Sequence, residues 1–131
     1  MALDPAGHIR VAVSDLPASI LFYEKLFAQL RYRREREKAW VTLYGLGFWL
    51  IQVKYQGLKY VHGATPGLHH LCFPTDTRSR VDMIYDFLLR EGVAISDPPR
   101  DYPEYTDGDE EYYAVFFYDP DGIKLEAAYH K

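Results

Sequence analysis

The sequence predicts an α+β fold built from two similar modules, at about residues 5–58 and 66–131. Three observations support this prediction. Each half begins with a short run of strand-like residues, HIRVAV in the first and HHLCFP in the second. A helix-capping residue and apolar residues spaced three and four apart follow each run, as in an amphipathic helix. Further strand-like runs complete each half, so each module has the order strand, helix, strand, strand, strand. We expect one domain over residues 1–131.

The first module begins with a predicted strand over residues 8–13. Ser14 or Asp15 can cap the helix that follows, and Pro17 suits its first turn. The apolar stripe of this helix consists of Leu16, Ile20, Tyr23 and Phe27. Further strands are predicted over residues 30–34, 39–44 and 48–55.

The second module begins with a predicted strand over residues 69–74. Asp76 or Thr77 can cap its helix, and Gly92 suits the helix end, where a left-handed residue is common. The apolar stripe consists of Val81, Ile84 and Leu88. Further strands are predicted over residues 93–96, 112–118 and 123–129, and the last follows an Asp-Pro-Asp-Gly turn.

The composition excludes several classes of partner. The net charge of −4 gives no reason to expect a nucleic acid, and acidic residues interrupt the locally basic stretch RYRREREK. No apolar stretch is long enough to cross a membrane as a helix, and no signal peptide is recognisable. The single cysteine, Cys72, cannot form an intrachain disulfide, which fits a reducing compartment. We therefore expect a cytoplasmic protein.

Residues of the types that bind metal ions occur at equivalent positions of the two modules. His8 begins the first strand of module one, and His70, or else His69, begins that of module two. The last strands carry Gln52 in module one and Glu126 in module two. Imidazole nitrogens and carboxylate oxygens suit divalent transition metals, and an amide oxygen can add a weaker bond. The alternatives are histidines with structural hydrogen bonds and a glutamate on a solvated sheet face.

The stretches HIRVAVSDLPASILFYEKLF, GLHHLCF and FFYDPDGIKLE resemble the vicinal oxygen chelate superfamily, which includes glyoxalase I, extradiol dioxygenases and bleomycin resistance proteins. The resemblance implies two βαβββ modules whose curved mixed sheets surround a metal-binding cup. Carried over by position, it implies His8, Gln52, His70 and Glu126 as ligands of one divalent metal ion. Zinc or nickel is favoured, with manganese or iron as alternatives. The resemblance also implies a homodimer.

The implied activity is that of a metal-dependent lyase or isomerase of the glyoxalase I type. It would act on a small oxygenated metabolite by proton transfer through a metal-stabilised enediolate, with Glu126 as the catalytic base. Arg10, Lys54 and Phe116 are expected to bind the substrate. One alternative is a mononuclear iron extradiol-type dioxygenase that uses His8, His70 and Glu126. Another is a non-catalytic protein that binds a small molecule such as an antibiotic, since residues 99–113 are acidic and aromatic.

Overall fold

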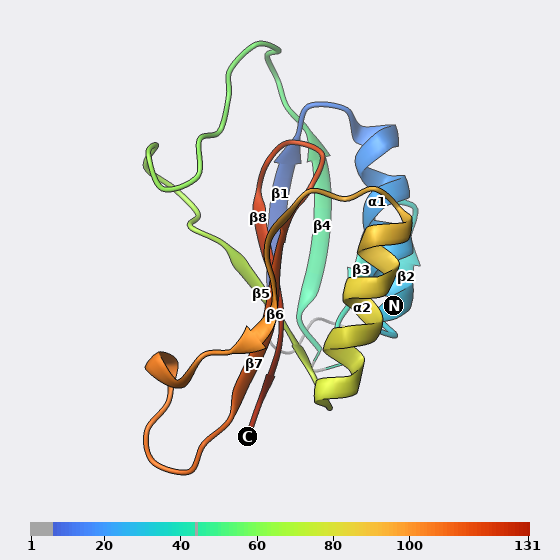
Figure 1. Ribbon diagram of the computed structural model, residues 1–131. Coiled ribbons are helices and arrows are strands. Elements are labelled where there is room, and N and C mark those ends of the chain that lie inside the picture. The colour runs from blue at the N-terminus through green and yellow to red at the C-terminus, as the bar shows by residue number, and fades with distance from the viewer. Residues whose placement is uncertain (1–6, 44) are drawn as a thin grey trace. The chain divides into compact units, whose positions relative to one another are not determined.

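The computed structural model describes residues 7–43 and 45–131 (Figure 1). The chain divides into two compact units, Met1–Lys59 and Tyr60–Lys131, which we call unit 1 and unit 2. Each contains one α-helix and one four-stranded mixed sheet, so the predicted α+β class and the two modules are confirmed. The single domain over residues 1–131 stays a prediction. None of the described helices is long and apolar enough to span a membrane.

Unit 1 places one helix on a mixed sheet. It consists of β1 (His8–Val13), α1 (Leu16–Gln29), β2 (Arg33–Arg36), β3 (Ala39–Val41) and β4 (Gly47–Gln52). The strand order is β1-β4-β3-β2, with β1 parallel to β4 and the other neighbours antiparallel. Aromatic rings fill the core, where the Phe27 ring centroid lies 5.3 Å from Trp40 and 4.9 Å from Phe48.

Unit 2 repeats this arrangement. It consists of β5 (Leu71–Thr75), α2 (Arg78–Arg90), β6 (Ile95–Asp101), a 3₁₀-helix η1 (Pro103–Tyr105), β7 (Tyr112–Tyr118) and β8 (Lys124–His130). The strand order is β5-β8-β7-β6, with β5 parallel to β8. The predicted stripe of α2 is fully buried, as are Leu125 and Ala127 of β8. These two residues therefore occupy the face of the sheet that packs on α2.

Both helices begin at side-chain caps. Asp15 accepts a hydrogen bond from the Ala18 N–H at 3.2 Å, and Thr77 accepts one from the Arg80 N–H at 3.0 Å. These bonds satisfy backbone donors that a helix start leaves without partners. They also decide which member of each predicted pair is the cap. Gly92 has a φ of +68°, as predicted for the residue after α2.

Several strand boundaries of unit 1 differ from the prediction, and β3 in particular ends at Val41 rather than at residue 44. β2 begins at Arg33 rather than at residue 30, because residues 30–32 complete the end of α1. There the Tyr32 N–H donates to the Phe27 carbonyl at 2.9 Å. β4 ends at Gln52 rather than at residue 55. Apolar residues within 30–32 and 53–55 follow the pattern of a strand, which explains why the sequence predicted longer strands there.

The prediction of β6 over residues 93–96 is also wrong, because this strand covers Ile95–Asp101. It contains Pro98 and Pro99, which lack the N–H that a central strand must donate. The strand accordingly lies at the edge of the sheet, and its register with β7 is irregular between Asp97 and Arg100. Proline is tolerated at such an edge, which the sequence pattern alone does not indicate.

Gln52 connects the end of β4 to the start of α1. Its Oε1 accepts a hydrogen bond from the Leu16 N–H at 3.0 Å, and its Nε2 donates to the Ser14 carbonyl at 2.7 Å. The Gln56 Nε2 donates to the same carbonyl at 2.9 Å. Gln52 therefore has a structural role, since it supports the cap that Asp15 provides.

We predict that Gln52→Ala lowers the free energy of unfolding by about 1 kcal/mol, because two hydrogen bonds at an exposed helix start are lost. Urea denaturation followed by circular dichroism measures this change. Gln56→Ala is the matched control and should cost clearly less, because Gln52 still donates to the Ser14 carbonyl. Equal stability of Gln52→Ala and the unmodified chain would show that the two hydrogen bonds do not support α1.

Candidate functional site

Glu126 lies at the centre of the unit 2 sheet. It occupies the middle of β8, level with Cys72 on β5 and with Phe116 on β7. Because side chains alternate along a strand, Glu126 points away from the face that packs on α2, together with Lys124 and Ala128. Its side chain is nevertheless only 2% exposed. The wet sheet face considered as an alternative for Glu126 is therefore wrong.

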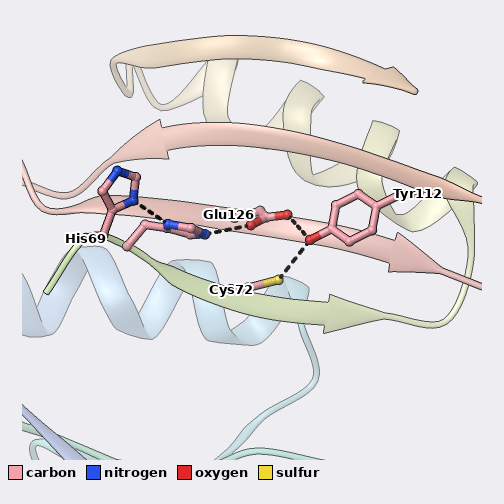
Figure 2. A network of polar contacts seen from close by, with 5 residues as sticks. His69, Cys72, Tyr112 and Glu126 are labelled. Carbon is pink, nitrogen blue, oxygen red and sulfur yellow. Dashed lines mark hydrogen bonds and ion pairs between the residues drawn. The ribbon is translucent and has the colours of Figure 1, made fainter. Parts of the chain in front are cut away.

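Two side chains satisfy this buried carboxylate. The His70 Nε2 lies 3.0 Å from Oε1, and the Tyr112 hydroxyl donates a hydrogen bond to Oε2 (Figure 2). A buried carboxylate without such partners would be strongly unfavourable. Burial and the bond to Glu126 raise the pKa of the Tyr112 hydroxyl, so this group keeps its proton at neutral pH. Glu126 is thus held between an imidazole and a permanent donor.

The network continues through a second imidazole. The His69 Nδ1 lies 2.8 Å from the His70 Nδ1. One of the two nitrogens therefore carries a proton and donates a hydrogen bond that the other accepts. His69 therefore contacts His70 rather than replacing it beside Glu126. The His62 ring stacks edge-on against His69, with centroids 4.3 Å apart.

Cys72 ends the network on the other side. Its Sγ lies 3.9 Å from the Tyr112 hydroxyl (Figure 2). The residue as a whole is exposed, yet burial of the sulfur and then the charge of Glu126 raise the pKa of the thiol from 9.0 to about 12. The hydrogen bond with Tyr112 opposes this effect. The thiol is therefore protonated at neutral pH and is no ready nucleophile.

A pocket of about 470 Å³ opens over this network. It is lined by His69, His70, Asp97, Arg100, Tyr102, Tyr105, Tyr112, Phe116, Lys124 and Glu126. The volume lies within the range usual for sites that bind small molecules. All ten residues belong to unit 2, and four of them are aromatic. The acidic and aromatic segment over residues 99–113 thus contributes pocket walls through Arg100, Tyr102, Tyr105 and Tyr112.

Three of the predicted site residues therefore meet in one pocket, namely His70, Glu126 and Phe116. The prediction missed Tyr112, Tyr102 and Lys124. A signal for two of them was present, because Lys124 precedes Glu126 by two residues and so shares its face. Tyr112 likewise shares a face with Phe116 along β7. Tyr102 gave no such signal, since it follows β6, whose register with β7 is irregular between Ile95 and Arg100.

His8 and Gln52 do not lie side by side in unit 1. His8 pairs with Gly47 and Val13 pairs with Gln52, so they are five positions apart along two parallel strands. At about 3.3 Å per residue this separation is about 16 Å, whereas ligands of one metal ion lie within a few ångströms of one another. The Gln52 amide also forms hydrogen bonds with the backbone at the start of α1. The register therefore does not bring these two predicted ligands together.

The residue of unit 1 that corresponds to Glu126 is Trp49. In unit 2, Glu126 is level with Cys72, two residues after His70. In unit 1, the residue two after His8 is Arg10, and it is level with Trp49. An indole offers no lone pair to a metal. Gln52, which the sequence repeat suggested as the equivalent of Glu126, lies three residues after Trp49 on β4. Because side chains alternate along a strand, Gln52 projects from the opposite face of the sheet to Trp49.

The predicted substrate residues of unit 1 lie near aromatic rings. The Arg10 guanidinium lies 5.4 Å from the centroid of Trp49, and Arg36 lies 5.7 Å from the same ring. Lys54 follows β4, with its ammonium 5.4 Å from the Tyr55 ring. A role of Arg10 and Lys54 in substrate binding stays a prediction.

The donors of unit 2 fit part of a metal site. The imidazole of His70 and the carboxylate of Glu126 converge, and both are common ligands of zinc, iron, nickel and manganese. Within residues 7–43 and 45–131, no three His, Cys, Asp or Glu side chains are grouped so as to hold a metal ion. This pair therefore provides two of the three or four protein ligands that a transition-metal site usually has.

We predict that Cys72 reacts with 5,5′-dithiobis(2-nitrobenzoate) at pH 8 at least about a hundredfold more slowly than in the urea-unfolded chain, because little thiolate is present. The rate should rise steeply between pH 9 and 12 as the thiol ionises. Glu126→Gln should accelerate labelling at pH 8, since a negative charge beside the sulfur is removed. Labelling of the folded chain at the unfolded rate would contradict this description of the network.

The comparisons with known proteins agree with this fold. The model of the Glyoxalase/Bleomycin resistance protein/Dioxygenase superfamily matches residues 6–127. YqjT of Bacillus subtilis, described as uncharacterized, is 32% identical over 123 residues, which are 91% of this chain and 94% of that protein. Virulence protein STM3117 of Salmonella typhimurium is 29% identical over 131 residues, with 96% and 84% covered.

A solved structure shows the same architecture. The crystal structure of a glyoxylase/bleomycin resistance protein/dioxygenase domain from Frankia sp. EAN1pec superposes with a TM-score of 0.74 at 23% identity. The superposition covers 95% of each chain. At this identity the likeness concerns the fold, whereas the family model extends over nearly the whole sequence. The chain belongs to the Glyoxalase/Bleomycin resistance protein/Dioxygenase superfamily.

Proposed function

We propose that the protein is a metal-dependent enzyme that acts on a small oxygenated molecule in the pocket of unit 2. The observation that carries this proposal is the buried Glu126, 3.0 Å from the His70 Nε2 and facing a pocket of about 470 Å³. Imidazole and carboxylate side chains that share a cleft are typical of functional sites. Family membership supports the same conclusion.

His70, Glu126 and His8 are the residues that would hold the metal. His70 and Glu126 supply an imidazole nitrogen and a carboxylate oxygen, and His8 begins β1 as His70 precedes β5. Gln52 is excluded from the proposal, because its amide bonds to the start of α1. When bound, a divalent metal would supply Lewis-acid polarisation of substrate oxygens and, if it is iron, chemistry with dioxygen.

This ligand set favours one of the two reaction classes predicted from the sequence. The lyase or isomerase was expected to use four protein ligands, and Gln52 was the fourth. Two histidines and one carboxylate leave positions open, and this triad is typical of non-haem Fe(II) oxygenases. A mononuclear iron dioxygenase is therefore our first candidate.

Proton transfer by a glyoxalase-type lyase or isomerase is the second candidate. It is favoured by the hydrogen bond that the Tyr112 hydroxyl donates to Oε2 of Glu126, because the raised pKa of Tyr112 keeps the proton on this hydroxyl. In this reaction Glu126 would accept a proton from the substrate, while Tyr112 would hold the carboxylate in place. Phe116, 6% exposed and level with Glu126, would exclude water from the reacting atoms.

We predict about one metal ion per chain in purified, tag-free protein, measured by inductively coupled plasma mass spectrometry. His70→Ala and Glu126→Gln should lower metal occupancy at least about tenfold, because each removes a ligand. Gln52→Ala is the matched control and should retain the metal. Iron together with substrate-dependent oxygen uptake would support the dioxygenase, and zinc or nickel would support the lyase or isomerase. No metal after reconstitution would contradict both and leave the small-molecule binding protein predicted as an alternative.

The homodimer and the cytoplasmic location belong to the same proposal. A dimer is implied by the resemblance of the sequence to small members of the family, and a single Cys72 suits a reducing compartment. Light scattering at micromolar protein concentration tests the homodimer, and a fluorescent fusion in the source cell tests the cytoplasmic location.

A further inference from the structure

We propose that Lys124 binds the carboxylate of the substrate, so that the pocket of unit 2 selects small organic acids with a flat apolar body. This inference rests on the proposed function, because it concerns the same pocket. It assigns a substrate class and a specificity residue, neither of which follows from the metal ligands.

The first observation is the placement of Lys124. It lies two residues before Glu126 on β8, so the two side chains project from the same face of the sheet. Lys124 lines the pocket, and its ammonium lies 4.8 Å from the centroid of the Phe116 ring. The cation is therefore held at an aromatic wall, beside the candidate reaction centre.

The second observation is the charge balance of the pocket. Arg100 has its own partners, since its guanidinium bonds to Glu104 at 2.9 Å and to the Asp101 carbonyl at 2.7 Å. Glu126 is occupied by His70 and Tyr112. For Lys124, the described part of the chain provides the Phe116 ring but no carboxylate within ion-pair distance. An anion in the pocket would supply that missing partner.

The third observation is the aromatic lining. Tyr105 lines the pocket and is 57% exposed, and its ring is stacked on the buried Tyr102 with an interplanar angle of 4°. Tyr102 in turn meets Phe116 edge-on at 5.5 Å. Rings held in this way offer flat apolar surfaces to a ligand at little loss of conformational entropy. A ligand that satisfies both Lys124 and these rings carries a carboxylate and a flat apolar body.

One acidic residue provides an internal control. Asp97 also lines the pocket, level with Phe116 on the neighbouring strand, and accepts a hydrogen bond from the Ser96 hydroxyl at 2.8 Å. It would repel a carboxylate and attract an amine. Neutralising Lys124 should therefore weaken the binding of a carboxylate, whereas neutralising Asp97 should maintain or strengthen it.

The test is isothermal titration calorimetry with benzoate and phenylacetate, each compared with its neutral amide, and with acetate as a charged probe without an apolar body. Both aromatic acids should bind more tightly than their amides and than acetate. Lys124→Met should weaken binding of the acids by about tenfold or more, since a charge-assisted contact is lost, and should leave the amides unaffected. Asp97→Asn should maintain or strengthen binding of the acids.

Lys131→Met controls for the loss of one positive charge from unit 2, because Lys131 lies outside the pocket lining. Circular dichroism confirms that each variant is folded. Metal content measured on the same samples keeps the two proposals apart. Acid binding that depends on Lys124 in protein without metal would support this inference and contradict the metal enzyme. Metal-loaded protein that binds no acid, or binds acids equally in Lys124→Met, would overturn this inference and leave the metal enzyme standing.

Discussion

The buried carboxylate of Glu126 is the constraint on which the functional half of the molecule depends. A carboxylate that is 2% exposed must be paired or neutralised, and removing one partner of a buried ionic pair commonly costs about 3–5 kcal/mol. The sheet satisfies this requirement by placing His70 immediately before β5 and Tyr112 on β7, the two strands that flank β8. The pairing of β5 and β7 with β8 therefore fixes the chemistry of the pocket.

The two units use one topology for different surfaces. Both have a parallel pair of strands at one side of the sheet, formed by β1 with β4 and by β5 with β8. At the position where unit 2 carries Glu126, unit 1 carries Trp49, with Arg10 and Arg36 near its ring. Unit 2 thus offers anionic oxygen ligands, whereas unit 1 offers cations on an aromatic ring. A repeated fold need not repeat its chemistry.

The fold was predictable because its signals are local. Caps at Asp15 and Thr77, apolar stripes on two helices and the turn before β8 each act over a few residues, and the caps and stripes recur in both halves. The residues of the site were harder to predict, because a sequence repeat does not fix register. Glu126 and His70 were found from the position and the family motif. Gln52 was assigned by its place on the last strand, whereas the pairing with β1 makes Trp49, three positions earlier, the equivalent of Glu126.

Other features depend on contacts that no periodicity encodes. Tyr102 lines the pocket immediately after the edge strand β6, whose register with β7 is irregular, and Tyr112 contacts Glu126 from the neighbouring strand β7. A sequence pattern shows that such residues share a face, but not which side chains meet above it. The neutral state of Cys72 is a further example, because it arises from the sheet surroundings and from Glu126 on a different strand.

The most direct test of this account is the anomalous scattering of a crystal grown with manganese, recorded near the absorption edge of the metal. The account predicts one strong peak within about 2.3 Å of both the His70 Nε2 and a carboxylate oxygen of Glu126, with Gln52 still bonded to the start of α1. A metal peak coordinated by Gln52, or metal bound elsewhere with His70 and Glu126 still paired to each other, would contradict it.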